Sequence, residues 1–168
     1  MTRISLFFLA AALFAAACSS EGASDLMDKA RGLEKADNPE EALPLYEKLY
    51  QEHADDDNAP EALFRCAAIY YNTQKDILKA ATTYELVSEK YPDSEYGHKG
   101  LFIAAFTYAN ELANYERART AYEKYLSAYP DSSMTETVRF ELENLGKTPE
   151  ELLESLQQPT AEEAPVTD

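Results

Sequence analysis

Residues 80–94 read AATTYELVSEKYPDS, and this stretch recurs along the chain at a fixed distance. A second copy occupies residues 118–132, and a weaker copy begins at Ala42. Alanine stands at positions 42, 80 and 118 and tyrosine at positions 46, 84 and 122, so the period is 38 residues. A fixed period of roughly 20 to 50 residues is typical of proteins whose units bury their apolar faces by stacking on one another. The period therefore predicts a stacked array of repeated units.

The pattern within each copy predicts helices. Apolar residues recur three and four positions apart, which places them on one face of a helix. Asn38, Asp76 and Asn114 favour helix N-termini and repeat with the same period. Pro92 and Pro130 end the second helix of their copies. The predicted helices cover residues 24–36, 39–53, 60–73, 77–90, 95–112, 115–128, 133–145 and 149–157. We therefore predict an all-α fold, an α-solenoid of antiparallel helix pairs.

The array is expected to hold about three repeats followed by a C-terminal capping pair of helices. Stacked arrays need end units with a polar outer face, and the glutamate-rich segment from Pro149 fits that role. The polar, acidic end of the chain is expected to be disordered. The predicted divisions are a signal peptide (1–17), a lipidated tether (18–23), the repeat domain (24–157) and a disordered acidic tail (158–168).

The N-terminus reads as an export signal. Arg3 provides a positive charge, and the uncharged apolar run after it is shorter than the roughly 20 residues that span a bilayer. Three alanines followed by Cys18 resemble a bacterial lipobox, which implies that Cys18 is lipidated and anchors the protein to a membrane through acyl chains such as palmitate. In lipoproteins of this kind, Ser19 in place of aspartate implies the periplasmic face of the outer membrane. Ordinary cleavage with secretion to the periplasm, or an uncleaved anchor, remain alternatives.

The charge of the chain argues against nucleic acid as a partner. The formal net charge is -16, and binding to phosphates needs lysine and arginine gathered on one face. A mean hydropathy of -0.47 with 45% hydrophobic residues is typical of a soluble globular body. The acidity is most simply interpreted as a means of keeping that body soluble.

The repeat resembles the tetratricopeptide repeat (TPR). That motif places an aromatic residue and small residues on the first helix, an alanine with an aromatic residue four positions later on the second, and a proline after it. Here Phe64, Ala68, Ala80, Tyr84 and Pro92 fall at those places, and the copy 38 residues later follows the same order. The resemblance implies a protein-binding scaffold with no enzymatic activity and no cofactor.

The longer period and the exported N-terminus extend this resemblance. The four residues beyond the usual 34 lie between Pro92 and Phe102. Longer repeats with YPDS turns on a lipoprotein resemble the BamD-like lipoproteins of outer-membrane protein assembly. They are also similar to the periplasmic coordinator that works with the Tol–Pal system, which leaves a role in the cell envelope, peptidoglycan or division as the alternative.

No residue pattern predicts a catalytic or metal site. His53 and His98 are interpreted as structural residues at repeat junctions, and the acidic run 55–58 as a capping turn that lacks the spaced ligands of a calcium loop. Cys66 falls beside the predicted core and is interpreted as an inert buried thiol. Most tyrosines follow the repeat and are assigned to the core.

The expected working surface is the concave groove lined by the first helix of each pair. An envelope protein or peptide would bind there through polar, basic and apolar side chains. The positions expected to be exposed in the groove are Met27, Arg31, Arg65, Ile69, Asn72, Ile103, Thr107 and Asn110. Arg31 and Arg65 stand out as a basic pair on an acidic protein.

Overall fold

The computed structural model describes residues 21–157, which form eight α-helices. The predicted signal peptide, Cys18 and the acidic tail 158–168 lie outside the described residues. The helices are α1 (Ala23–Lys35), α2 (Pro39–Glu52), α3 (Ala59–Asn72), α4 (Ile77–Lys90), α5 (Glu95–Asn110), α6 (Tyr115–Ala128), α7 (Thr135–Glu143) and α8 (Pro149–Gln157). The predicted all-α fold is confirmed.

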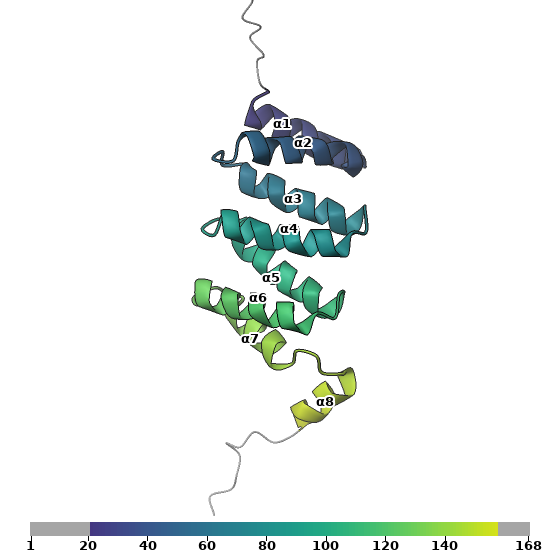
Figure 1. Cartoon of the computed structure of the whole chain (residues 1–168), viewed down its shortest axis with the longest axis vertical. Coiled ribbons are helices and arrows are strands. Elements are labelled where there is room, and N and C mark those ends of the chain that lie inside the picture. Colours follow the sequence, from purple (N-terminus) through teal and green to yellow (C-terminus); the bar gives the residue numbers. More distant parts are fainter. Residues whose placement is uncertain (1–20, 158–168) are drawn as a thin grey trace, which may run out of the picture.

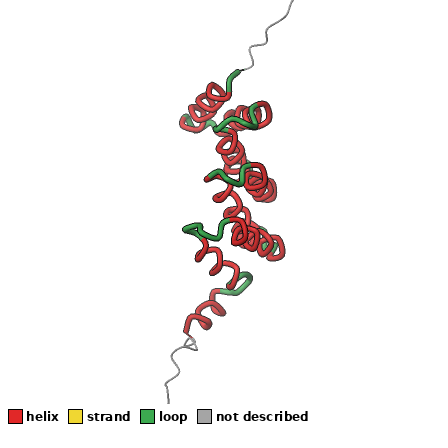
Figure 2. Tube along the Cα trace, turned by 90° about the vertical axis from the view of Figure 1, so that its left-hand side faces the viewer, coloured by secondary structure: helices red, strands yellow, loops and turns green. Residues whose placement is uncertain are grey.

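The helices stack along one axis. From α1 to α7, each helix packs on the next one in the chain, and α3 also touches α5 (Figure 1). Seen from the side, α2, α4 and α6 lie along one edge of the stack and the odd-numbered helices along the other (Figure 2). The odd-numbered helices are the first helices of the predicted pairs, and we call the side of the stack that they line the wall.

Small residues at repeated positions let the helices approach each other closely. Ala42, Ala80 and Ala118 are fully buried, and so are Tyr46 and Tyr122, which fill the space beside them. Protein interiors are closely packed, so a small residue at one position is matched by a large one beside it. The alanine and aromatic positions of the repeat therefore form the core, as the pattern predicted.

The 38-residue period is also visible in the backbone. Asp37, Lys75 and Ala113 all adopt positive φ angles, of 63°, 57° and 48°, in the turn between the two helices of a pair. The next residue in two of these turns caps the following helix, because the side chains of Asp76 and Asn114 accept hydrogen bonds from backbone N–H groups. Each pair is thus closed by the same turn.

The junction between α4 and α5 depends on two glycines. A Cβ atom at Gly97 would lie 2.2 Å from the backbone oxygen of Tyr91, and one at Gly100 would lie 2.7 Å from that of Tyr84. Both distances are shorter than any normal contact. Because only glycine fits, these residues fix how closely the α5–α6 pair sits on the α3–α4 pair.

The C-terminal end of the stack departs from the expected capping pair. α7 packs on α6, but α8 does not pack along α7 and lies apart from the stack in Figure 1. Phe140 of α7, the counterpart of Phe64 and Phe102, is 45% exposed as a result. Phe106, a large aromatic residue of α5, is also exposed, at 41%.

We expect Gly100→Ala to lower the free energy of unfolding by about 1–3 kcal/mol, because the new methyl group would meet the backbone of α4. Gly32→Ala is the matched control. Gly32 lies inside α1, and a Cβ atom at this position would have no heavy atom within 4 Å, so this change should raise stability by up to about 1 kcal/mol. Chemical denaturation of both variants measures the two values. Equal effects at the two positions would contradict the close approach of α4 and α5.

Candidate partner-binding groove

The odd-numbered helices expose a narrower strip than the sequence predicted. Arg31, Asn72 and Asn110 are exposed, and Arg65 and Ile103 are half-buried. Three positions expected to be exposed are buried instead, since Met27, Ile69 and Thr107 are only 1%, 3% and 2% exposed. The expectation that these three line the surface is therefore wrong.

Met27 of α1 packs into the core cluster that α1 forms with α2 and α3. The burial of Ile69 and Thr107 follows from the number of neighbours around their helices. α3 packs on α2, α4 and α5, and α5 packs on α3, α4 and α6. A helix enclosed by three neighbours buries more than one stripe of side chains. Ile69 accordingly joins the same core cluster as Tyr70 and Cys66.

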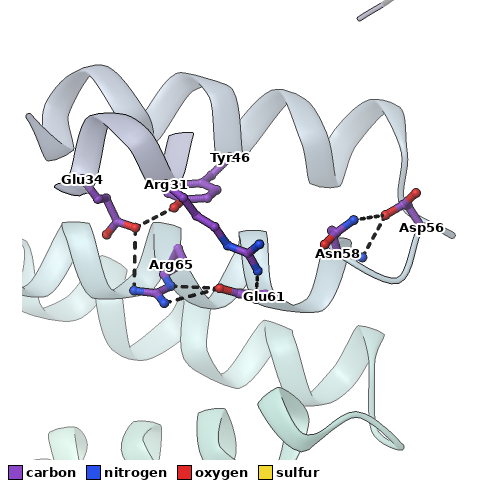
Figure 3. Close-up of polar contacts among 7 residues, drawn as sticks. All are labelled: Arg31, Glu34, Tyr46, Asp56, Asn58, Glu61 and Arg65. Carbon is purple, nitrogen blue, oxygen red and sulfur yellow. Dashed lines mark hydrogen bonds and ion pairs between the residues drawn. The ribbon is translucent and has the colours of Figure 1, made fainter. Parts of the chain in front are cut away.

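The N-terminal half of the strip carries a network of ion pairs between α1 and α3 (Figure 3). Arg31 donates to Glu61 at 2.6 Å, and Arg65 contacts Glu61 at 3.3 Å. Arg65 also lies 3.7 Å from Glu34, which accepts a hydrogen bond of 2.5 Å from the hydroxyl group of Tyr46. The two arginines that stood out in the sequence are thus neutralised by carboxylates of the chain itself.

Glu61 is the centre of this network. It is only 8% exposed, and its burial alone would raise the pKa of the carboxyl group. Hydrogen bonds from Arg31 and Tyr96, together with the charges of Arg31 and Arg65, outweigh the burial and hold the pKa of Glu61 below its usual value of 4.5. The carboxylate therefore stays ionised at neutral pH and joins α1 to α3.

The C-terminal half of the strip is apolar. Phe102 and Ile103 are half-buried, and the ring of Phe106 lies 6.2 Å from the ring of Phe102. Phe140 continues this surface on α7, at the position equivalent to Phe102. The wall therefore changes along the stack from charged on α1 and α3 to aromatic on α5 and α7.

Phe106 was missed as a surface residue. Its sequence context places it beside a core alanine, and helical periodicity alone assigns it to the buried face. The signal that would have found it is a comparison between copies: the equivalent positions are Ala30 and Ala68. A large apolar residue at a place where the other copies need only a methyl group does not fit inside the same packing.

Hollows adjoin the turns of the array. One, of about 460 Å³, is lined by the turn between α1 and α2 and by the end of α3, with Asn72 on its wall. A second, of about 200 Å³, lies between the ends of α5 and α7, with Asn110 on its wall. Asn72 and Asn110, both expected in the groove, thus line hollows beside the turns.

Outside the strip, a repeated cluster ties neighbouring pairs together. The hydroxyl group of Tyr70 donates to Glu47 of the preceding pair, and that of Tyr108 donates to Glu85 at 3.0 Å. A cation covers each ring: the ammonium group of Lys79 lies 3.9 Å from the centre of the Tyr70 ring, and the guanidinium group of Arg117 lies 4.6 Å from that of Tyr108. Each of these tyrosines therefore links the first helix of its pair to the preceding pair.

The other polar candidates have structural partners. The Nε2 atom of His53 lies 3.0 Å from the backbone oxygen of Glu21, and His98 stacks on Tyr129 with 4.0 Å between ring centres. Cys66 is a buried free thiol whose pKa is raised, mainly by that burial. Asp56 caps the turn before α3, because its carboxylate accepts hydrogen bonds from the backbone and side-chain N–H groups of Asn58.

The described part of the chain contains neither a metal-binding cluster nor a membrane-spanning helix. Residues 21–157 hold no group of three or more side chains suited to bind a metal ion. Within the same range, none of the helices is both long and apolar enough to cross a membrane.

We expect Glu61→Gln to lower the free energy of unfolding by about 1–3 kcal/mol at pH 7, because two arginines lose their shared charged partner. Since the pKa of Glu61 is lowered in the folded state, the stabilisation is complete above the unfolded value of 4.5 and disappears as the pH falls through the lowered pKa. The difference from wild type should therefore shrink in acid. Glu52→Gln, at an exposed position of α2, serves as the control and should change stability by less than about 0.5 kcal/mol at either pH. A deficit of Glu61→Gln that persists below the lowered pKa would contradict the network.

Two segments of the chain match the family model of the tetratricopeptide repeat, residues 61–94 and 100–132. They cover α3 with α4 and α5 with α6, and the residues between them begin α5, within the stretch where the sequence predicted the longer period. No curated protein matches the chain. Tetratricopeptide repeats act as scaffolds for protein–protein interaction. The chain thus contains tetratricopeptide repeats and folds as a TPR-type α-solenoid.

Proposed function

We propose that the protein is a lipid-anchored periplasmic scaffold that holds another envelope protein in the groove formed by its odd-numbered helices, and that it serves outer-membrane protein assembly as BamD-like lipoproteins do. One observation carries the proposal. Side chains of very different chemistry, from Arg31 and Arg65 to Phe106, reach solvent along one wall of a stack whose other repeated positions are used for packing. Such a wall offers a partner both polar and apolar contacts.

The proposed attachment to the envelope rests on the N-terminal sequence. The three alanines before Cys18 and the serine after it support lipidation and the outer membrane. Glu21, three residues after Cys18, accepts hydrogen bonds from Lys29 and from Lys48, the latter at 3.4 Å. The described chain is therefore pinned to α1 and α2 close to the proposed anchor. An anchor at Cys18 would hold the N-terminal end of the stack beside the membrane.

The alternative within the envelope is a coordinator of the Tol–Pal type, tied to peptidoglycan or cell division. Both roles require a protein partner, and the groove serves either. The two roles differ in the identity of the partner, so the crosslinking experiment described below decides between them.

Cys18→Ser should move the protein from the membrane fraction to the soluble periplasm, because the acyl chains that hold it have no thiol to join. Fractionation of cells followed by immunoblotting measures this. Cys66→Ser, which removes the buried thiol, is the control and should leave the protein on the membrane. A Cys18→Ser protein that stays on the membrane would contradict the lipid anchor.

In-cell photo-crosslinking tests the groove. A photoreactive residue in place of Phe106 should capture a component of the barrel-assembly machinery, because Phe106 is exposed on the wall. The same residue in place of Lys90, exposed on α4, should not capture it. Mass spectrometry identifies the product. Capture of Tol–Pal proteins or peptidoglycan enzymes would overturn the assembly role in favour of the coordinator, and equal capture from both positions would contradict the groove.

A further inference from the structure

A carboxyl group without a partner lies at the apolar end of the groove. Glu141 of α7 is half-buried, and among the described residues it forms no hydrogen bond and no ion pair. It occupies the position equivalent to Arg65 on α3 and Ile103 on α5. Arg65 forms ion pairs with Glu34 and Glu61. Glu141, by contrast, has no counter-charge among the residues that the structure describes.

A second polar group near Glu141 is also unsatisfied. Tyr122 is fully buried, and its hydroxyl group has no hydrogen-bond partner within residues 21–157. The negative charge of Glu141 raises the pKa of Tyr122 further, after the larger effect of burial, which places the two groups within electrostatic reach. Burial alone raises the pKa of Glu141. A carboxylate that has lost water without gaining a cation is costly, and binding of a cation would relieve that cost.

The space beside Glu141 is open. A hollow of about 200 Å³ between α5 and α7 is lined by Asn110, Glu141, Asn144 and Tyr115, among others. Lys147 lines the same hollow, but its ammonium group donates to the Oδ1 atom of Asn144 at 2.9 Å rather than to Glu141. Arg139, also on α7, pairs with Glu136 at 3.7 Å. These two cations are therefore engaged elsewhere.

Apolar side chains accompany this carboxyl group on the same wall. Phe106 of α5 and Phe140 of α7 are 41% and 45% exposed, although both are large aromatic residues. Phe140 directly precedes Glu141 on α7, and Phe106 lies one helical turn before Asn110, which lines the hollow. Aromatic residues are enriched in protein–protein interfaces, and a complementary charge pair adds specificity to them.

We propose that this end of the groove binds a segment of the partner protein in which a lysine or arginine is flanked by apolar residues. The cation pairs with Glu141, and the apolar side chains pack on Phe106 and Phe140. The inference rests on the proposed partner-binding function of the groove and specifies the chemistry of what it binds.

Charge separates this occupant from the other candidates. After Lys147 the chain contains six acidic residues and no lysine or arginine, so its own C-terminal segment offers Glu141 no cation. A second copy of the chain carries a formal net charge of -16 and would be repelled as a whole. A basic, partly apolar segment of another protein supplies the missing cation and is attracted to the acidic chain.

Two synthetic peptides of equal length test the proposal with the purified chain. One contains leucine at helical spacing with lysine between the leucines, and the other has glutamine in place of each lysine. The lysine peptide should bind at least about tenfold more tightly to the wild-type protein, as expected for one charge-assisted contact. Glu141→Gln should remove most of that tenfold preference.

Matched variants separate this site from general attraction to an acidic protein. Glu143→Gln removes an equal charge from an exposed position of the same helix and should change affinity less than about twofold. Phe140→Ser should weaken both peptides, because it removes an apolar contact. Circular dichroism confirms that each variant remains helical. Equal losses for Glu141→Gln and Glu143→Gln, or no loss for either, would overturn the proposal.

The same pair of variants distinguishes failure of this inference from failure of the groove. The photoreactive residue at position 106 can be combined with Glu141→Gln. If this protein still captures its partner in cells at the wild-type yield, the groove functions without the basic contact and the inference is wrong. If wild-type protein captures nothing from position 106, the groove itself is refuted. Loss of capture by Glu141→Gln but not by Glu143→Gln supports both.

Discussion

The close approach of α4 and α5 is the constraint on which the rest of the structure depends. Gly97 and Gly100 allow backbone to meet backbone at this junction, and no residue with a side chain fits there. Fully buried alanines at positions 42, 80 and 118 allow the close packing inside each pair. Because every helix from α2 to α6 is held between neighbours, the array behaves as one stack, and the surface left to solvent is narrow.

This packing explains the chemistry of the groove wall. Side chains on helices enclosed by three neighbours are buried in the core, so only a strip of each odd-numbered helix reaches solvent. Along that strip, α1 and α3 form ion pairs centred on Glu61, which stabilise the fold and neutralise the arginines. α5 and α7 instead leave Phe106, Phe140 and a Glu141 that is unpaired within the described chain. The exposed aromatic residues and the unpaired carboxyl group therefore lie on α5 and α7, in the C-terminal half of the stack (Figure 1).

The repeat made the fold predictable from the sequence, and the same repeat limited the prediction of the site. Periodic alanines, caps and prolines place each helix within a few residues of its observed bounds, because these signals act locally. Exposure depends on how many neighbours surround a helix, which periodicity does not report, so Ile69 and Thr107 were assigned to the surface. Glu61 and Arg65 stand four residues apart on α3, so helical spacing could have indicated that pair. The contacts of Arg31 with Glu61 and of Arg65 with Glu34 join different helices, and sequence spacing does not reveal them.

The central claim is that a partner protein lies along the odd-numbered helices and contacts mainly α5 and α7. Hydrogen–deuterium exchange of the protein, alone and in complex with the partner recovered by crosslinking, tests it most directly. We predict slower exchange on binding in α5 and α7, with little change in α2 and α4. Protection confined to α2, α4 and α6 would place the partner on the opposite edge of the stack and contradict the account.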